Sequence, residues 1–403
     1  MSARYDVIVA SHLRWSFVWQ RPQQVLSRIA RRHRVLFIEE PIFPAQGDPQ
    51  PFSPLQQACH NVWVLAPRVA APERPGTPVW QDRASISLQV LEAMRTLQIG
   101  RRALWFYTPL PEFLLEVVRP DIVVYDVMDE LANFKFAPPE LKEQEARLLR
   151  RADVVFTGGA SLYEAKQAFN PNTHLFASGV DTAHYSLACR PDTKVPAFVD
   201  DLPAPRAVYI GVIDERLDYP LIAHAAAARP HVQFLMVGPV VKVDPADLPK
   251  APNLHYVGQQ QYQDLPRILK GCDLCLMPFA RNEATRFISP TKTLEYMATH
   301  RPIVSTPIRD VERFYSDIVY LASGPEEFVR QMDAALNESA SERARRNVRE
   351  ERILAEHAWD AIAANMERIM DQAFDARLAR IRPPVVAPTA RYAPATARIA
   401  TEA

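Results

Sequence analysis

Short runs of apolar residues alternate with segments of helical periodicity along most of the chain. The runs are nearly continuous rather than alternating with polar positions, as expected of strands buried on both faces of a sheet. Strands of this kind that alternate with helices are typical of parallel, doubly wound α/β sheets. The predicted strands are 6–10, 34–39, 62–67, 103–107, 122–127, 154–158 and 174–177 in the first half, and 207–212, 233–238, 254–258, 274–279, 302–306 and 319–322 in the second.

A proline-rich segment without periodicity, residues 183–206, separates the two halves. It predicts a linker between an N-terminal domain, 1–182, and a C-terminal domain, 207–355. Residues 356–382 follow with the pattern of one long amphipathic helix, and the Pro- and Ala-rich tail 383–403 is expected to be disordered. Two facing α/β domains form a cleft at the carboxyl ends of their strands, where ligands bind.

Charge and composition exclude several classes of protein. The 403 residues carry 47 Lys and Arg against 47 Asp and Glu, so nothing indicates a nucleic-acid partner. The first apolar run is too short for a signal peptide, and no stretch approaches the roughly 18 apolar residues of a membrane span. We therefore expect a cytoplasmic protein, with peripheral attachment to a membrane as an open alternative.

The segment SPTKTLEYMA, starting at Ser289, predicts a helix with an unusual first turn. Ser289 is a good N-cap residue, and Pro290 suits the first helical position. On that register Lys292 is the third residue, where its charge opposes the positive end of the helix dipole by about 0.3–1 kcal/mol. A bound phosphate would offset this mismatch, whereas a solvated surface lysine is the alternative.

Several cofactor motifs are missing from the sequence. It has no G-x-G-x-x-G and no P-loop, which disfavours dinucleotide dehydrogenases and P-loop NTPases. Cys272 and Cys275 form C-x-x-C, but no further ligands follow at the spacing of a zinc site. We interpret these two cysteines as structural and expect no metal and no cofactor.

Four segments of the second half resemble, in combination, the donor-binding domain of GT-B fold glycosyltransferases of family 4 (glycosyl transferases group 1). They are FASGVDTAHY (176–185), YIGVIDERLD (209–218), 255–279 and SPTKTLEYMATHRPIVST (289–306). HLRWSFVWQRPQ after the first strand resembles the signature of a bacterial polysaccharide-type subgroup. The resemblance covers residues 5 to about 370 and implies a GT-B architecture of two Rossmann-like domains. It also implies that helix 356–382 returns to the N-terminal domain.

The resemblance also implies a set of donor-binding residues in the C-terminal domain. A basic residue of the first glycine loop and the N-terminus of the 289–306 helix would hold the donor diphosphate. A glycine-ended loop would lie beside the nucleobase, and a glutamate would accept hydrogen bonds from the ribose. The matching residues are Arg216, Ser289, Thr291 and Lys292 for the phosphates, and Gly258, Gln259 and Glu295 for the nucleoside.

One position departs from the family pattern. Many family 4 enzymes carry two glutamates eight residues apart, the first near the donor sugar. Counting back from Glu295 gives Phe287, and Glu283 is out of register. The resemblance therefore leaves the choice between a retaining and an inverting reaction open.

Polar residues at two strand ends of the first half are candidates for catalysis. His12 follows the first strand, where an imidazole can act as a base or bind substrate. Asp129 follows another strand and can steer an acceptor hydroxyl. The alternatives are a structural histidine that caps the loop and a carboxylate that caps a helix.

Arg14, Trp15 and Arg21 form a basic and aromatic loop that is a candidate for acceptor binding. Either arginine can equally form a structural ion pair. The helix that follows is basic and amphipathic and could lie on an anionic membrane, although packing on the sheet requires the same apolar stripe.

These features together predict a metal-independent glycosyltransferase. It would transfer a sugar from a nucleotide-diphosphate sugar to a glycan or lipid-linked acceptor in bacterial surface or exopolysaccharide biosynthesis. The expected location is the cytoplasm, with a peripheral contact at the inner membrane as an option. The alternatives are a GT-B nucleotide-sugar epimerase and a non-catalytic relative that binds sugar or a partner protein.

Overall fold

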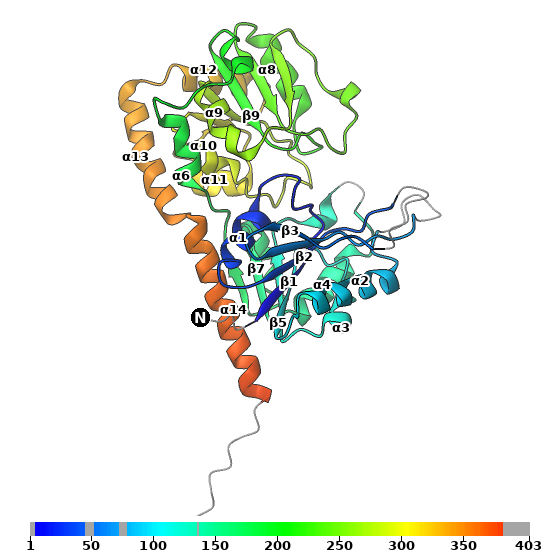
Figure 1. Cartoon of the computed structure of the whole chain (residues 1–403). Helices are drawn as coiled ribbons and strands as arrows, with labels where there is room; N and C mark the ends of the chain where they lie inside the picture. Colours follow the sequence, from blue (N-terminus) through cyan, green and yellow to red (C-terminus); the bar gives the residue numbers. More distant parts are fainter. Residues whose placement is uncertain (1–4, 45–51, 72–78, 135–136, 382–403) are drawn as a thin grey trace, which may run out of the picture.

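The computed structural model describes residues 5–44, 52–71, 79–134 and 137–381. These residues form two α/β domains, each built on its own sheet (Figure 1). Every predicted strand is present, and the two doubly wound sheets are confirmed. The prediction that residues 383–403 are disordered lies outside the described residues.

The first sheet has eight strands in the order β3-β4-β2-β1-β5-β6-β7-β8, and all pairs are parallel except β3 with β4. Strand β3 was not predicted because its residues are polar and mostly exposed at the edge of the sheet. The strands are β1 (Asp6–Ala10), β2 (Val35–Ile38), β3 (Gln56–Cys59), β4 (Val62–Leu65), β5 (Arg102–Phe106), β6 (Ile122–Val127), β7 (Val154–Thr157) and β8 (Thr173–Leu175).

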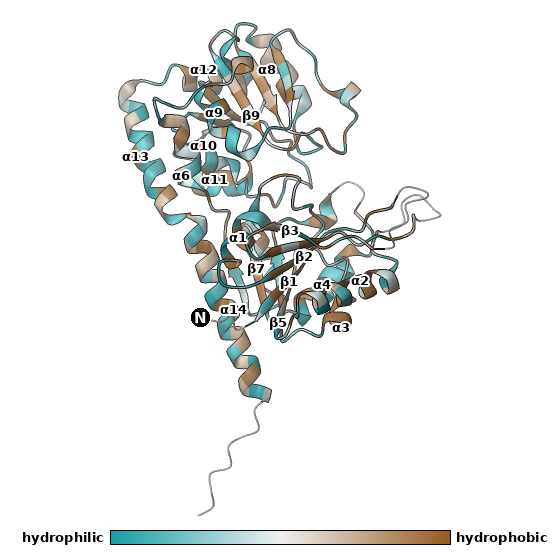
Figure 2. Cartoon of the chain, in the orientation of Figure 1, coloured by the Kyte–Doolittle hydropathy of each residue, from teal (hydrophilic) through white to brown (hydrophobic). Residues whose placement is uncertain are grey.

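Helices cover both faces of the first sheet because alternate side chains of each strand point to opposite sides. Val7 and Val9 of β1 pack toward α1, whereas Ile8 of the same strand packs toward α2, α3 and α4. Figure 2 shows the resulting apolar strands between helices of mixed polarity. The helices are α1 (Arg21–Ile29), α2 (Arg83–Thr96), α3 (Leu114–Val118), η1 (Leu131–Asn133), α4 (Leu141–Arg151) and α5 (Ala160–Lys166).

The second sheet has six strands in the order β11-β10-β9-β12-β13-β14, and all its pairs are parallel. Its strands are β9 (Arg206–Ile210), β10 (Gln233–Val237), β11 (Leu254–Gly258), β12 (Leu274–Met277), β13 (Ile303–Ser305) and β14 (Tyr320–Leu321). The helices are α8 (Tyr219–Ala228), η3 (Pro245–Asp247), η4 (Tyr262–Asp264), α9 (Leu265–Lys270), α10 (Lys292–Met297), α11 (Arg309–Tyr315), α12 (Pro325–Leu336) and α13 (Ala340–Glu356).

The segment between the sheets contains three short helices, α6 (Thr182–Tyr185), η2 (Ser186–Cys189) and α7 (Ala197–Asp200). Its apolar side chains Tyr185, Ala188 and Val199 are buried in the core of the second domain. The segment therefore connects the two sheets and also packs firmly on one of them.

The last helix, α14 (Trp359–Ile381), runs back along the first domain (Figure 1). Trp359, Met366 and Met370 are buried in the core beneath the first sheet, and α14 contacts α1 closely. Asp360 of α14 also pairs with Arg28 of α1 at 3.2 Å and with Arg31, just after α1, at 2.7 Å. The apolar face of α1 is thus covered by protein, in agreement with the packing interpretation.

Among the described helices, none combines the length and the apolar composition that a membrane crossing requires.

Candidate active site

A cavity of about 410 Å³ lies between the two domains, at the carboxyl ends of strands from both sheets. The first domain contributes residues 15–21, Met128, Asp129, Gly158 and Ser178. The second domain contributes the loops after β9, β10 and β11 and the start of α10. The cavity therefore brings together segments that are far apart in the sequence.

Helix α10 starts later than predicted. Its first residue is Lys292, and Thr291 rather than Ser289 is the N-cap residue. Thr291 already has a helical φ of −53°, and the amides of Thr293 and Leu294 donate to the carbonyls of Pro290 and Thr291 at 3.1 and 3.0 Å. The prediction that Ser289 caps the helix is wrong because a tight turn at Pro290 precedes the helix. Ser289 and Thr291 both line the cavity.

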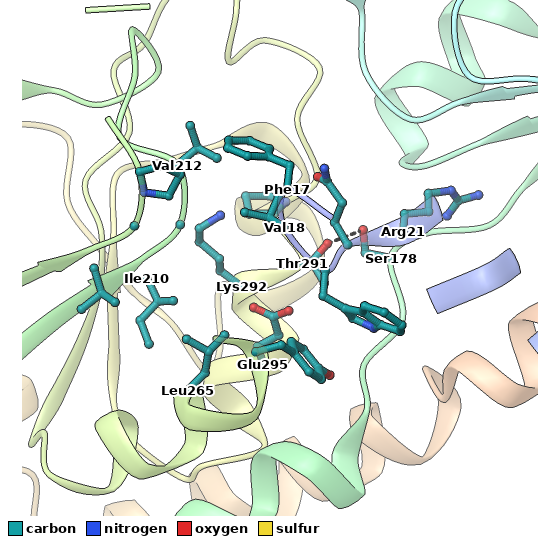
Figure 3. A pocket seen from close by; sticks show the side chains of 18 of the residues that line it. Phe17, Val18, Arg21, Ser178, Ile210, Val212, Leu265, Thr291, Lys292 and Glu295 are labelled. Atoms are coloured by element: carbon teal, nitrogen blue, oxygen red, sulfur yellow. Dashed lines mark hydrogen bonds between the residues drawn. The ribbon is translucent and has the colours of Figure 1, made fainter. Parts of the chain in front are cut away.

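Thr291 is held by a contact between the domains. Its hydroxyl donates to Oγ of Ser178 at 2.9 Å (Figure 3). Ser178 replaces the asparagine of the family pattern and also borders the cavity. The start of α10 is therefore anchored to the segment that ends the first domain.

Lys292 projects into the cavity across a glycine (Figure 3). Gly211 has a φ of +153°, and a Cβ there would lie 2.2 Å from Cε of Lys292 and 2.6 Å from Nζ. The backbone of β9 therefore leaves room for this side chain only at a residue without Cβ. Burial lowers the pKa of Lys292, and the nearby charge of Arg216 lowers it further.

Arg216 lines the same cavity and pairs with Asp214 through Nε and Nη2 at 2.9 and 2.8 Å. Burial by itself would lower the pKa of Arg216, but the hydrogen bonds that its guanidinium donates to Asp214 and the charge of that carboxylate outweigh burial and raise the pKa. Arg216 is therefore both an ion-pair partner of Asp214 and a fixed cation at the cavity wall.

Glu295 follows Lys292 by one turn of α10 and also faces the cavity (Figure 3). Burial raises the pKa of its carboxyl group, whereas Lys292 and a hydrogen bond from Tyr185 lower it. The Tyr185 hydroxyl thus holds Glu295 from the side of α6. Sequence reasoning quoted Tyr185 within a family segment but assigned it no role.

The nucleobase loop follows β11. Gly258 ends this strand with a φ of +78° and lies just outside the cavity lining, whereas Gln259 and Gln260 belong to it. The side-chain amide of Gln259 donates to the carbonyl of Phe17 in the first domain. This loop therefore lies at the cavity, and its expected place beside a nucleobase stays a prediction.

Asp129 lies in the cavity wall opposite the second domain. Burial raises the pKa of its carboxyl group, and Arg216 acts in the opposite direction. The short helix η1 begins at Leu131 with Glu130 as its cap residue, so Asp129 is not the N-cap.

His12 follows β1 as predicted, but it lies outside the cavity lining. Burial and the charge of Lys242 lower its pKa from 6.5 to about 4, so the imidazole is neutral at pH 7. Its buried Nδ1 has no hydrogen-bond partner among the described residues.

The two arginines proposed for the acceptor form ion pairs within the first domain. Arg21 is buried and binds Asp126 at 2.9 Å, and Arg14 lies 3.2 Å from Glu39. For both residues the structural interpretation is correct, although the edge of Arg21 still borders the cavity. Trp15 is buried against Phe37, with 5.2 Å between ring centroids, and forms part of the cavity wall.

The segment before α10 does not bring a carboxylate to the cavity. Phe287 packs against the core of the first domain, and Arg286 lies 5.2 Å from its ring centroid. Glu283 is paired with Arg286 at 3.5 Å. The lining from this segment starts at Ile288.

A second glycine at an adjacent strand end was not singled out by sequence reasoning. Gly238 directly follows β10 with a φ of +148°, and a Cβ there would lie 1.9 Å from the carbonyl oxygen of Gly211. Both glycines line the cavity beside Lys292. A glycine directly after an apolar run was the available signal. Among the described residues, no group of three or more His, Cys, Asp or Glu side chains is placed to hold a metal ion.

Comparisons with known proteins agree with this geometry. Residues 219–368 match the family described as glycosyl transferase-like. TuaH of Bacillus subtilis (strain 168), assigned to glycosyl transfer in teichuronic acid biosynthesis, is 24% identical over 271 residues, covering 62% of this chain and 68% of that protein.

Solved structures share the fold over almost the whole chain. Sucrose-phosphate synthase from Thermosynechococcus elongatus superposes with a TM-score of 0.69 at 16% identity, covering 93% of this chain and all of that chain. Anabaena HepE, solved in complex with UDP and glucose, superposes with a TM-score of 0.62 at 12% identity, covering 92% of this chain and 100% of that chain. These solved structures show the fold, whereas the family match and the similarity to TuaH favour glycosyl transfer over the epimerase and the non-catalytic alternatives. The chain is a glycosyltransferase with the GT-B fold.

Proposed function

We propose that this protein transfers a sugar from a nucleotide-diphosphate sugar to a glycan or lipid-linked acceptor in bacterial surface or exopolysaccharide biosynthesis. One observation carries the proposal: two cations, Lys292 and Arg216, converge on a cavity between the domains, with Glu295 one helical turn away. The family 4 resemblance and the N-terminal signature belong to the same proposal.

Lys292 and Arg216 stabilise the leaving group. As the bond between the anomeric carbon and the diphosphate oxygen breaks, negative charge builds on the diphosphate, and fixed cations in a buried site stabilise it strongly. The Asp214 pair fixes the guanidinium of Arg216 in place before substrate binds. In this proposal side chains rather than a metal neutralise the diphosphate.

Asp129 serves the acceptor. The acceptor hydroxyl oxygen forms the new bond to the anomeric carbon, and its proton passes to the Asp129 carboxylate on the first-domain side of the cavity. The raised pKa of this carboxyl group makes it a better proton acceptor than an exposed aspartate.

Known relatives support the class of donor and product. HepE was solved with UDP and glucose, and a trehalose-6-phosphate enzyme of E. coli with UDP-2-fluoro glucose, at TM-scores of 0.62 and 0.64. TuaH is assigned to teichuronic acid biosynthesis. We expect the reaction in the cytoplasm, with the acceptor presented at the inner membrane.

The test is release of nucleoside diphosphate from UDP-, GDP-, CDP-, ADP- and TDP-sugars, with and without a glycolipid extract as acceptor. One donor should be consumed faster with the extract and equally well in EDTA. Asp129→Asn should lower kcat by about 10²–10⁴-fold while nucleotide binding remains. Conversion of a donor to its epimer without acceptor would contradict the proposal, as would a failure of every nucleoside diphosphate to bind.

A further inference from the structure

The loop of residues 15–20 belongs to the first domain but meets the nucleobase loop of the second. The Gln259 amide donates to the carbonyl of Phe17, and the rings of Trp19 and Tyr262 lie 5.9 Å apart. Gln24, in the helix after the loop, donates to the Tyr262 hydroxyl at 3.1 Å. Three contacts thus connect this loop and its helix to residues 259–262.

Tyr262 is a fixed platform within the second domain. Its ring stacks on His184 with 4.1 Å between centroids and 12° between planes. The carbonyl of Tyr262 also lies 2.9 Å from Nε2 of the same histidine. Trp19 therefore approaches a ring whose other face is already covered.

The loop itself is anchored at both ends. The backbone amide of Trp15 donates to Glu39 at 2.6 Å, and the Gln23 side chain donates to the Trp15 carbonyl at 2.9 Å. At the other end the amide of Gln20 donates to the Gln23 side chain at 3.1 Å as part of a capping box. The residues between these anchors project from a rigid base.

The projecting side chains face the donor-binding residues. Phe17 and Val18 line the same cavity as Val212 and Lys292 (Figure 3). Trp19 borders the same cavity beside the nucleobase loop and keeps 37% of its surface exposed. An indole ring that is anchored at its base and open on one side can stack on a planar base.

We propose that Trp19 and its loop form the first-domain wall of the nucleoside site, so that both domains recognise the base of the donor. This inference rests on the proposed function, because it requires a nucleotide whose phosphates lie at Lys292. Affinity for the nucleoside then depends on contact between the domains. A donor is held fully only when residues 15–20 meet residues 259–262.

The test measures dissociation constants of UDP, GDP, CDP, ADP, TDP and inorganic pyrophosphate by calorimetry for Trp19→Ala and Trp19→Phe. Trp19→Ala should weaken the preferred nucleotide about 5–100-fold and reduce the preference among bases, since stacking on an aromatic ring contributes this much. Pyrophosphate should bind with unchanged affinity. Trp19→Phe should recover part of the loss.

The control is Phe169→Ala, an aromatic residue of the same domain that is 45% exposed and lies outside the cavity lining, and it should change nothing. Unchanged or tighter nucleotide binding in Trp19→Ala, with binding still lost in Lys292→Met, would overturn the inference and leave the proposed function intact. Equal weakening of pyrophosphate and nucleotide would also overturn it. Binding that survives Lys292→Met would instead count against the proposed function.

Discussion

The substitution Lys292→Met distinguishes two hypotheses for this lysine: that it binds the donor phosphate, or that it only stabilises the fold. Methionine keeps most of the length of the side chain and removes its charge. In the free protein the charge is unfavourable, because burial and Arg216 both lower the pKa of Lys292. The free variant should therefore be at least as stable as the wild type.

The expected loss of nucleotide binding follows from the charge that Lys292 offers. A hydrogen bond between a charged side chain and a phosphate contributes about 1.5–3 kcal/mol, which corresponds to about 10–150-fold in the dissociation constant. A nucleotide at 100 times its dissociation constant stabilises the wild type by about 2.7 kcal/mol. If binding weakens 100-fold, the same concentration stabilises the variant by only about 0.4 kcal/mol.

The assay is thermal unfolding with each of the five nucleoside diphosphates. Lys242→Met is the matched control, because this lysine lies outside the cavity lining and interacts with Glu215 at 3.9 Å. It should keep the nucleotide response. A free Lys292→Met protein that is destabilised and still responds fully to nucleotide would refute the reasoning, because Lys292 would then be a structural partner of Glu295.

The dependence of stability on alkaline pH provides a second test of the buried charge on Lys292. Its pKa in the folded state is below the usual 10.5, so the unfolded state binds more protons between the two values. The unfavourable contribution is complete below the folded pKa, shrinks as the pH rises from the folded pKa toward 10.5, and is gone above 10.5. The unfolding free energy of the wild type should therefore rise relative to Lys292→Met in this window, measured by urea unfolding.

Three further predictions concern residues around the site. Gly211→Ala should displace Lys292, abolish nucleotide binding and lower the unfolding free energy by about 1–3 kcal/mol. A nucleotide dissociation constant equal to that of the wild type, measured by calorimetry, would contradict this. Arg21→Met should lower the unfolding free energy, measured with urea, by about 3–5 kcal/mol because it leaves Asp126 buried and unpaired. A variant of normal stability that only binds acceptor more weakly would disprove the structural role. The pKa of His12 lies at about 4, so the unfolding free energy of the wild type should fall as the pH drops from 6.5 to 4. It should fall less steeply in His12→Asn. Parallel pH profiles of unfolding free energy for the two proteins would argue against the burial of a neutral imidazole.

The sequence by itself determined the strands and the class of fold. Runs such as residues 7–10 are apolar throughout because both faces of a parallel strand are covered, and the strand can be predicted without knowing what covers it. Edge strand β3 (Gln56–Cys59) was not predicted because it is polar and mostly exposed, so it carries no apolar run. Motif resemblance also singled out Lys292 and Glu295, which lie one turn apart on the same helix and both line the cavity, whereas their roles toward a donor stay predictions.

Only the tertiary structure decided what each charged or aromatic residue contacts. Arg21 and Asp126 are 105 positions apart, so the pattern around Arg21 could not distinguish a buried ion pair from a ligand-binding cation. Helix α10 starts at Lys292 because a tight turn at Pro290 precedes it, and Thr291 in this turn donates a hydrogen bond to Ser178 across the domains. The loop of residues 15–20 meets the nucleobase loop for a similar reason. Its place depends on how two separately formed sheets face each other, and contacts between domains leave no periodic signal in the chain.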